Sequence, residues 1–400
     1  MSLDLSQTVA QLDRVISGLK SRRSAKAEAV VQARRLLKES DASVIEERRN
    51  AGKFLWRSVA ALSPDAAAVH DAPPLPADYA VAAVDGSHID VSRHAPAPFY
   101  LINIGYVALR YGELAEARLW NTPKLYSSDD DMVITDPESA LNTEFIEGQV
   151  LGVKRAVDEM AALADVVESL PEDLPVLALL DGSLTLVGLT SQNPPYVWEA
   201  LLNNGLLPAL DRLHKLAKNR TLAVASYISL PRSEQVVTTL RLQACPFAQV
   251  NCLHECNNEQ RGKRACDIVG GITDRDLFAD LLALGQRSQT YRSLAKVMDE
   301  YGEHRVHFFY VNVGPELARV EMPGWAALSS QAVGFAHAAV LAQADKGHGY
   351  PVALSEAHEQ AVVTGQDRES FATLLGEAMV AQKLLVTTSE KARSKRSRFV

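Results

Sequence analysis

Two short apolar segments of the sequence each lead into the tripeptide Asp-Gly-Ser. Ala-Val-Ala-Ala-Val precedes Asp85, and Val-Leu-Ala-Leu-Leu precedes Asp181. An Asp that ends a buried strand has its backbone held by the sheet and its side chain presented at the edge, while the following Gly permits a tight turn or a close approach. Two such carboxylates on neighbouring strands are suited to hard cations such as Mg²⁺ or Mn²⁺. Cations placed there could activate water and orient a phosphodiester.

Each tripeptide also has a plain structural explanation. Asp-Gly after a strand is a common turn signal, so one copy alone favours a turn, and two copies leave turn and metal site equally open. A buried strand ending in Asp is also typical of nucleoside triphosphatases, but the sequence has no G-x-x-x-x-G-K-[ST] motif, and Arg-Gly-Lys-Arg at 261–264 is not one. The absence of a G-x-S-x-G motif argues against a serine hydrolase.

All four cysteines lie in one short segment of the chain, in the pattern Cys245-x₆-Cys252-x₃-Cys256-x₉-Cys266, with His254 among them. Clustered thiols favour a structural zinc site, with four thiolates preferred over a histidine ligand, and an iron–sulfur cluster is the less favoured alternative. Free thiols in an inserted loop would explain the pattern equally simply. Basic residues in the same segment would allow this insertion to contact DNA: Arg261, Lys263 and Arg264.

The elements that must position these residues indicate a mixed α/β protein. Residues 3–60 have the 3–4 spacing of a long helix whose apolar stripe must pack on the body of the protein or on a second subunit. A Pro/Ala-rich linker follows over residues 63–79. Beyond it, apolar strand patterns alternate with long helical patterns, and the segment after Trp325 is mostly helical. The stripe of the first helix consists of Val9, Leu12, Val15, Ile16 and Leu19.

Bulk composition narrows the class but leaves function open. The 400 residues are 47% hydrophobic, which is ample for a buried core, and no apolar run approaches the roughly 18 residues that span a bilayer. The amino-terminal sequence lacks a secretory pattern, and together with the four cysteines this predicts a cytoplasmic protein. A net charge of −8 argues against a protein that coats nucleic acid by general positive charge, yet it permits a nuclease with a locally basic groove.

An ordered set of motifs resembles the NurA family of nucleases. The family's A-V-D-G-S strand is matched by residues 83–87, its Arg-x-x-x-Glu helix element by residues 155–159, and its L-L-D-G-S-L strand by residues 179–184. Near the carboxyl end, Gly349-Tyr350-Pro351, Leu354 and Ala357-His358 match a further element, and Arg-Val-Glu-x-Pro at 319–323 fits the strand before it. The resemblance covers about residues 78–375, which predicts a nuclease domain there. A helical arm over residues 1–62 precedes it, residues 245–266 form a Cys-rich insertion within it, and a helix with a basic tail follows over residues 376–400.

The resemblance implies a ribonuclease H-like mixed sheet flanked by helices, with Asp85, Glu159 and Asp181 as metal carboxylates. It further implies that His358 assists as a proton shuttle, phosphate contact or metal ligand, roles that suit a group titrating near neutrality. Tyr227 falls where the family places an active-site tyrosine. For the third carboxylate, Glu144 and Glu147 remain alternatives, because spacings of 15 and 12 residues place them on similar helical faces.

Function follows from the same resemblance. It implies a 5′–3′ exonuclease and single-strand endonuclease using Mn²⁺ or Mg²⁺, acting on DNA ends in repair, resection or defence. It also implies a homodimer that works with a HerA-type hexameric ATPase, with no membrane association. Two other classes stay open: a metal phosphoesterase acting on small substrates, and a non-catalytic DNA-binding or scaffold subunit of a HerA-like complex.

Overall fold

The chain forms two compact units, each built from separate stretches of sequence. The computed structural model describes residues 5–54, 60–61, 65–91, 98–186, 188–190, 192–257, 260 and 262–383. The first unit comprises residues 1–72 and 228–324, and the second comprises residues 73–227 and 325–400. Within the described residues, none of the helices is long and apolar enough to cross a membrane.

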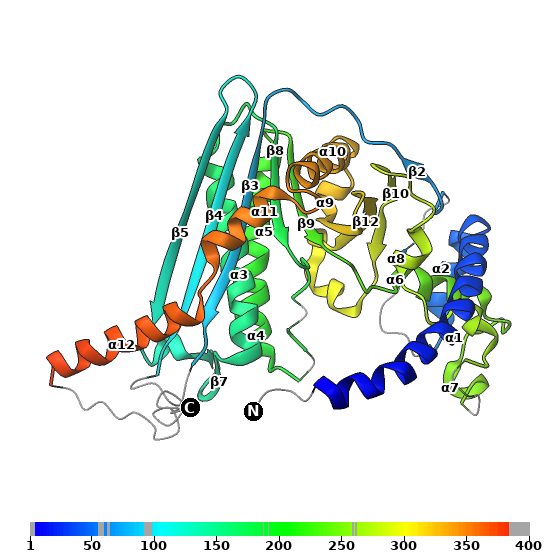
Figure 1. Ribbon diagram of the computed structural model, residues 1–400, viewed down its shortest axis with the longest axis horizontal. Helices are drawn as coiled ribbons and strands as arrows, with labels where there is room; N and C mark the ends of the chain where they lie inside the picture. The colour runs from blue at the N-terminus through cyan, green and yellow to red at the C-terminus, as the bar shows by residue number, and fades with distance from the viewer. Residues whose placement is uncertain are drawn as a thin grey trace. The chain divides into compact units, whose positions relative to one another are not determined.

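The second unit is organised around a mixed five-stranded sheet (Figure 1). Its strands lie in the order β5-β4-β3-β8-β9, with β4 antiparallel to both of its neighbours, β8 parallel to β3, and β9 parallel to β8. This is the ribonuclease H-like arrangement that the resemblance predicted. The bounds are β3 (Tyr79–Ile89), β4 (Tyr100–Tyr111), β5 (Glu116–Tyr126), β8 (Val176–Asp181) and β9 (Leu222–Ile228).

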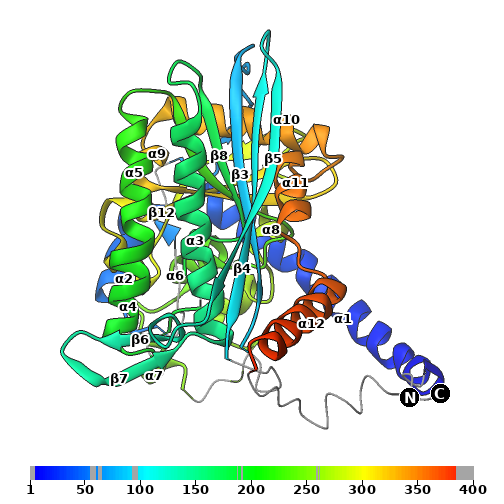
Figure 2. The ribbon, with the colours of Figure 1, turned by 90° about the vertical axis from the view of Figure 1, so that its left-hand side faces the viewer.

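Helices cover both faces of this sheet, which explains why β3 and β8 are continuous apolar runs rather than alternating ones. Figure 2 shows α3 and α5 on one side and α10 and α11 on the other. These helices are α3 (Gly148–Ser169), α5 (Leu207–Ala217), α10 (Ser330–Lys346) and α11 (Val352–Ala361). The unit also contains a hairpin of β6 (Val133–Asp136) and β7 (Ser139–Phe145), the short α4 (Pro195–Trp198), a π-helical segment (Glu199–Leu206) and α12 (Gly365–Ala381). A short helix, α9 (Gly324–Ala327), precedes α10.

The first unit has a smaller antiparallel sheet. The hairpin of β12 (Val306–Asn312) and β13 (Leu317–Pro323) is extended by β11 (Tyr291–Ser293) and β1 (Ala60–Ala61), while β10 (Arg287–Ser288) pairs with β12 and with β2 (Val69–His70). Its core gathers Leu37, Leu240, Phe308 and Tyr310. Its other elements are α1 (Leu5–Lys38), α2 (Ala42–Ala51), α6 (Gln235–Ala244), α7 (Cys252–Glu255), η3 (Ala265–Val269), α8 (Asp274–Phe278) and η4 (Lys296–His304).

The amino-terminal helical arm is present, but it is not the single helix predicted over residues 3–60. α1 ends at Lys38, and Asp41 begins α2 by accepting hydrogen bonds from the Ser43 and Val44 amides at 2.9 and 3.2 Å. Only the second half of α1 packs into the core of its unit, through residues such as Leu37. The predicted stripe in the first half stays 45–60% exposed: Val9, Leu12, Val15, Ile16 and Leu19.

Candidate active site

The register of the sheet places the two predicted aspartates side by side. β3 and β8 pair in parallel up to Val84 and Leu180, so Asp85 and Asp181 are the next residues on adjacent strands. Neighbouring side chains in register point to the same face of a sheet. The prediction that both strands end at Asp-Gly-Ser holds for β8 but is wrong for β3, which continues to Ile89 because β4 still supplies hydrogen-bonding partners along its other edge. Asp85 therefore lies where β3 loses β8 as a neighbour.

Helix α11 brings His358 to Asp85. The His358 Nδ1 atom lies 2.8 Å from Asp85 Oδ2, and the imidazole is 65% exposed whereas the aspartate side chain is 19% exposed. The helix can approach this closely because Gly105, opposite Asp85 on β4, has no side chain. A Cβ atom there would lie 2.3 Å from the Ala357 carbonyl oxygen. The end of α11 is fixed by Asn103, whose amide donates to the Ala361 carbonyl at 2.8 Å.

Helix α3 supplies the third predicted carboxylate, Glu159, from the opposite face of the sheet. Its residue exposure is only 9%, and its Oε1 atom lies 3.1 Å from Arg155 Nε. That contact lacks the alignment of a hydrogen bond, and Oε1 is buried without any hydrogen-bond partner. Gly86 makes room for it, since a Cβ at that position would lie 2.5 Å from Oε1. The third carboxylate is thus held against Gly86 of β3, the residue that follows Asp85, with Oε1 lacking a hydrogen bond.

Carboxylate charges influence the pKa values of Glu159 and Asp181. Burial raises the pKa of Glu159 to about 8; Arg155 opposes this shift, and the charges of Asp85 and Asp181 add to it. Loss of hydration also raises the pKa of Asp181, and Asp85 raises it further. Mutual repulsion of this kind is what a bound cation would relieve.

The two alternative glutamates lie elsewhere. Helix α3 begins at Gly148 rather than near residue 143, so Glu144 belongs to β7 and Glu147 is the residue before the first turn of the helix. The prediction that Glu144 shares this helix is therefore wrong. At a rise of about 1.5 Å per residue, Glu147 lies roughly 18 Å along the helix axis from Glu159, too far to share an ion with it. Position along the axis, not helical face, separates these candidates.

Two tyrosines lie beside Asp181: Tyr350, whose side chain forms a hydrogen bond with it, and the predicted Tyr227, its register partner on β9. A hydrogen bond from the Tyr350 side chain lowers the pKa of Asp181, against the larger effect of burial. Tyr227 is fully buried on β9 and packs edge-on against the Tyr350 ring, with centroids 5.5 Å apart. Tyr350 lies in the Gly-Tyr-Pro motif, so the motif itself was the signal that could have identified it. Tyr227 also pairs with Asp181 across the β8–β9 register, and its carbonyl accepts the Gly182 amide at 3.0 Å.

These residues fit a divalent cation. Oxygen ligands of several carboxylates suit Mg²⁺ or Mn²⁺, and a buried carboxylate oxygen without a partner is a ready ligand. A cavity of about 380 Å³ adjoins the site and is lined by Arg155, Glu159 and Asp181 among others. Within the described part of the chain, the ligand atoms of Asp85, Glu159 and Asp181 do not all lie within 4.8 Å of one another. The set is open enough for ions and a phosphate to enter between its members.

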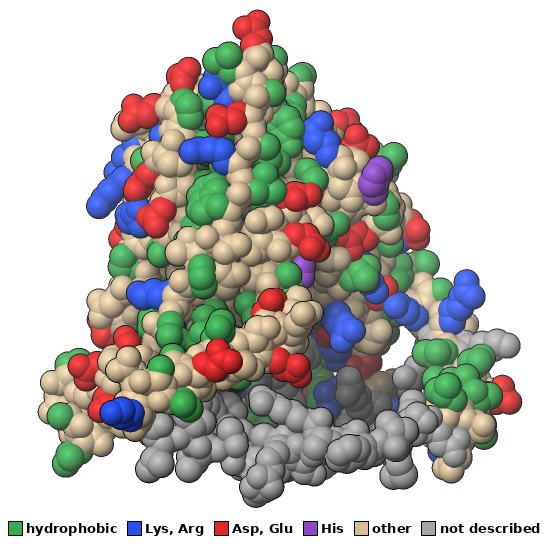
Figure 3. All heavy atoms as spheres, turned by 60° about the vertical axis from the view of Figure 1, so that its left-hand side comes forward, with side chains coloured by type: hydrophobic (Ala, Val, Ile, Leu, Met, Phe, Trp, Pro, Cys, Tyr) green, Lys and Arg blue, Asp and Glu red, His purple; other side chains and the backbone are tan. Residues whose placement is uncertain are grey.

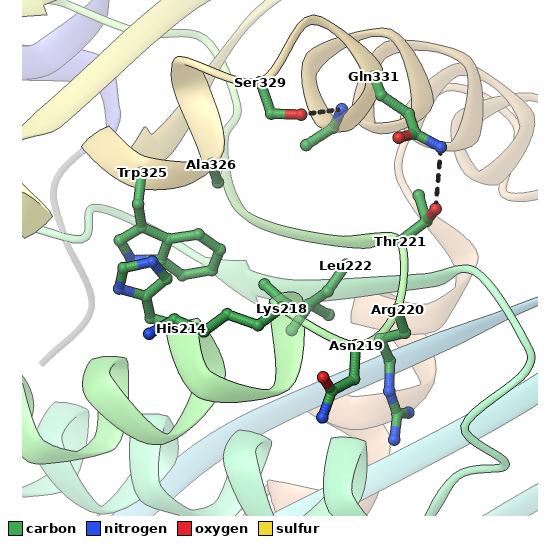
Figure 4. A pocket seen from close by; sticks show the side chains of 12 residues that line it. His214, Lys218, Asn219, Arg220, Thr221, Leu222, Trp325, Ala326, Ser329 and Gln331 are labelled. Carbon is green, nitrogen blue, oxygen red and sulfur yellow. Dashed lines mark hydrogen bonds between the residues drawn. The ribbon is translucent and has the colours of Figure 1, made fainter.

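A second cavity of about 470 Å³ in the same unit has a different character (Figure 4). His214 stacks on Trp325 with ring centroids 4.8 Å apart, and Gln331 donates to the Thr221 hydroxyl at 3.0 Å. Arg220 donates instead to carbonyl oxygens near the end of α3, including that of Val167. The described residues that line this cavity include no carboxylate, so it is not a competing site for a hard cation.

The four predicted cysteine ligands lie in the first unit, away from the carboxylates along the chain. None of them is in a disulfide. Cys245, Cys252 and Cys266 are buried, and Cys256 is partly exposed. Within the described residues, no three of the sulfur atoms lie within 4.8 Å of one another.

A five-stranded sheet of this order, with carboxylates at adjacent positions of its two central parallel strands, defines a ribonuclease H-like domain with a candidate metal centre. The family model for the NurA domain matches residues 79–363, and the chain belongs to the NurA family. No curated protein matches significantly.

Solved structures of NurA proteins align over most of the chain at low identity. The NurA nuclease from Sulfolobus solfataricus is 12% identical, with 96% of this chain and 98% of that chain covered and a TM-score of 0.49. A NurA structure bound to dAMP and manganese is 13% identical, with coverage of 92% and 96% and a TM-score of 0.39. A third, NurA with manganese, is 12% identical, with coverage of 92% and 97% and a TM-score of 0.34.

Proposed function

We propose that the protein is a divalent-metal-dependent nuclease that hydrolyses phosphodiester bonds of DNA at Asp85, Glu159 and Asp181. The observation that carries this proposal is the buried Glu159 carboxylate oxygen without a hydrogen-bond partner, held against Gly86 and beside two register-matched aspartates. All of these residues fall inside the NurA domain. A buried charge of this kind is costly unless it binds a cation or a proton.

Asp85, Glu159 and Asp181 would hold Mn²⁺ or Mg²⁺. When bound, such ions lower the pKa of a water molecule and neutralise charge on the phosphate. The chain's own contribution is to fix the ligands: the β3–β8 register aligns the aspartates, and α3 brings the glutamate from the opposite face. The two aspartates need no rearrangement of the backbone to converge, because their strands are already paired up to the preceding residue.

His358 and Tyr350 would act beside the carboxylates. Since His358 Nδ1 is engaged by Asp85, its Nε2 atom is the ring nitrogen that can contact a phosphate oxygen or carry a proton. The imidazole is largely exposed, which allows substrate to reach it. Tyr350 donates to Asp181 and thereby orients that carboxylate. A hydrogen bond to a ligand of this type fixes its rotamer and keeps it ionised.

DNA is the substrate we infer for this site, with 5′–3′ exonuclease and single-strand endonuclease activity as the finer form of the proposal. On the face drawn in Figure 3, acidic and basic side chains of the described residues are interspersed rather than gathered in one basic band. Because the chain carries a net charge of −8, bound metal ions would add positive charge to that of Arg155 at the site. Productive binding of DNA should therefore depend on the divalent ion itself.

The assembly belongs to the same proposal. The exposed stripe of α1, from Val9 to Leu19, is an apolar surface that a second copy of the chain could cover in a homodimer. A HerA-type hexameric ATPase is the partner that family membership suggests. Sedimentation of the full chain alone measures the homodimer, and sedimentation of its mixture with such an ATPase measures the complex.

The test of the activity compares isosteric variants. Asp85→Asn and Asp181→Asn should lower Mn²⁺-dependent cleavage of a 5′-labelled oligonucleotide by more than about 100-fold, because supporting residues alone typically cost 10–100-fold. Asp158→Asn is the matched control: Asp158 neighbours Glu159 on α3 but pairs with Lys154 at 3.0 Å. It should cut like the wild type.

Two outcomes would overturn the proposal. Wild-type cleavage by Asp85→Asn or Asp181→Asn would place the chemistry elsewhere or reveal a contaminating nuclease. Hydrolysis of bis(p-nitrophenyl) phosphate without cleavage of any single- or double-stranded DNA would instead indicate a phosphoesterase for small substrates. Retained circular dichroism spectra of the variants would exclude misfolding as the cause of a loss.

A further inference from the structure

The cysteine-rich segment of the first unit is anchored near each end by a residue outside it. Arg48 of α2 donates from Nη1 to the Leu242 and Cys245 carbonyl oxygens, both at 2.9 Å. These are the carbonyls left without partners at the end of α6, so the contact fixes the point where Cys245 leaves the helix.

The middle of the segment is held by backbone contacts. The Lys53 amide donates to the Val250 carbonyl at 2.6 Å, and the Cys252 amide donates to the Lys53 carbonyl at 2.9 Å. Cys252 then begins α7, and Cys256 ends it one turn later. Residues four apart across a helical turn lie on the same face, so these two thiols project in similar directions.

The last cysteine is fixed by Asp267. Its carboxylate accepts hydrogen bonds from the Gly262 and Arg264 amides at 2.7 and 3.1 Å and also pairs with Arg241. Arg241 Nη2 lies 3.6 Å from the Cys266 sulfur. Burial raises the pKa of Cys266, and the Arg241 guanidinium opposes that shift. The loop is thus folded back so that Cys266 faces a positive charge.

The four thiols are neighbours as a result. Cys245 and Cys252 share one buried cluster with Ile45, Leu242 and Val250. Burial raises the pKa of Cys256, and the three groups that raise it next are the thiols of Cys252, Cys266 and Cys245. The thiols of Cys245, Cys252 and Cys266 are therefore all close enough to Cys256 to affect it, although the segment spans 22 residues, from 245 to 266.

We propose that Cys245, Cys252, Cys256 and Cys266 bind one structural Zn²⁺ ion. This site is independent of the carboxylate centre and of the nuclease proposal. Four thiolates around one ion satisfy the usual tetrahedral zinc geometry. Thiolate ligands are too soft for Mg²⁺ or Mn²⁺, which the carboxylates favour. The ion would join the end of α6, both ends of α7 and η3.

A single ion suits this place better than an iron–sulfur cluster. Cys245 and Cys252 are already packed among apolar side chains, and such cores leave little free volume. Zn–S bonds of about 2.3 Å place sulfur atoms about 3.8 Å apart. Since no three of the described sulfurs lie within 4.8 Å, binding must draw them inward. Cys256, the most exposed of the four, has the room to move.

The direct test measures metal in the full-length wild-type protein. Purified from zinc-replete medium and passed through a chelating column, it should retain about one zinc per chain by mass spectrometry. Titration with an organomercurial should release that zinc after about four equivalents, as expected for four thiolate ligands. This measurement needs no variant, so it does not depend on whether a mutant folds.

Variants then identify the ligands. Cys256→Ser should lower zinc retention by at least about tenfold, since even residues that only support a ligand cost 10–100-fold in affinity. His254→Ala is the matched control, because this histidine lies within the segment but is 78% exposed and pairs with Glu255 at 2.8 Å. It should keep its zinc.

Three results would overturn the assignment. The first is a zinc content below about 0.1 per chain in native protein whose four thiols all react. The second is stoichiometric iron with visible absorbance. The third is that His254→Ala loses zinc whereas Cys256→Ser keeps it. In zinc-loaded protein, we further expect trypsin to cut after Lys263 more slowly than in protein treated with mercurial and chelator. Equal rates would contradict a role of the ion in drawing the segment together.

Discussion

The two candidate metal centres of this chain differ in what holds their ligands. In the second unit, Asp85 and Asp181 lie on paired strands, and their separation is fixed by the register of a buried sheet. In the first unit, the cysteines lie on short helices and turns that are fixed only by individual contacts, such as Arg48 with Cys245. The carboxylates are therefore largely positioned before any ion binds, whereas the thiols need the ion to complete their arrangement. A catalytic centre needs an open site, and a structural one can close around its ion.

The largest expected difference between the two centres is their response to chelation. Brief treatment with EDTA should abolish DNA cleavage, and added Mn²⁺ should restore it, because hard ions at an open carboxylate site exchange readily. The same treatment should leave the zinc of the cysteine site in place, since buried thiolates bind it far more tightly. Cleavage assays and metal analysis on the same sample measure both responses.

If EDTA affected the carboxylate site and the cysteine site alike, the proposed difference between the two metal centres would be wrong. If EDTA removed zinc and activity together, and Mn²⁺ alone failed to restore cleavage, the two centres would be coupled. The control is protein treated with zinc-saturated EDTA, which has no capacity left for either ion, so the treated protein should lose neither metal nor activity.

The second prediction compares Glu159 with Glu147 as the third carboxylate ligand of the metal ions. Glu159→Gln should lower cleavage by more than about 100-fold, because it removes the charge of a buried ligand whose Oε1 atom forms no hydrogen bond. Glu147→Gln, at the exposed position just before the same helix, should cut within about twofold of wild type, as surface substitutions usually do. Equal losses in both variants would mean that the glutamates act through the general charge of the helix.

The outcome for these glutamates shows what local sequence can predict. The strands before Asp85 and Asp181 were recognisable because buried parallel strands are short apolar runs with distinct ends. The face of α3 followed from helical periodicity. The start of α3 did not, because residues 139–145 pair with 133–136 in a hairpin that competes with helix formation. Such pairing depends on two segments at once and leaves little trace in either one.

Contacts between segments that are far apart in the chain could not be predicted from the sequence alone. The approach of α11 to β4 depends on Gly105, and a glycine in a strand pattern does not reveal which helix crosses it. His358 is accordingly identified through the family resemblance, because its position in a helical pattern alone does not distinguish it from an ordinary surface histidine. The exposed stripe of α1 likewise has the periodicity of a packed helix, although the described residues leave it uncovered. Periodicity shows that a face is apolar, not what covers it.

The third prediction tests whether this close approach positions the catalytic residues. Gly105→Ala should lower cleavage by about 10–100-fold, because a Cβ 2.3 Å from the Ala357 carbonyl must displace α11 and its histidine from Asp85. Gly376→Ala is the control: its Cβ would meet nothing within 4 Å on α12. That variant should retain activity and be slightly more stable, as Ala favours helices over Gly. Normal cleavage by Gly105→Ala would show that His358 need not contact Asp85.

The smallest expected effect is the difference in DNA cleavage between variants of the two tyrosines beside the carboxylates. Tyr350→Phe removes the hydrogen bond to Asp181 and should lower cleavage by about tenfold, the lower end of what residues supporting a metal ligand contribute. Because the carboxylate would be less well oriented, the variant should also need more Mn²⁺ for half-maximal activity. Tyr227→Phe keeps the ring that packs edge-on against Tyr350 and should cut within about threefold of wild type. Cleavage rates measured across a Mn²⁺ titration distinguish the two roles: a purely structural tyrosine would change the melting temperature without shifting the Mn²⁺ dependence. A larger shift for Tyr227→Phe than for Tyr350→Phe would reverse the assignment and place the predicted residue, rather than its neighbour, in contact with the metal ligands.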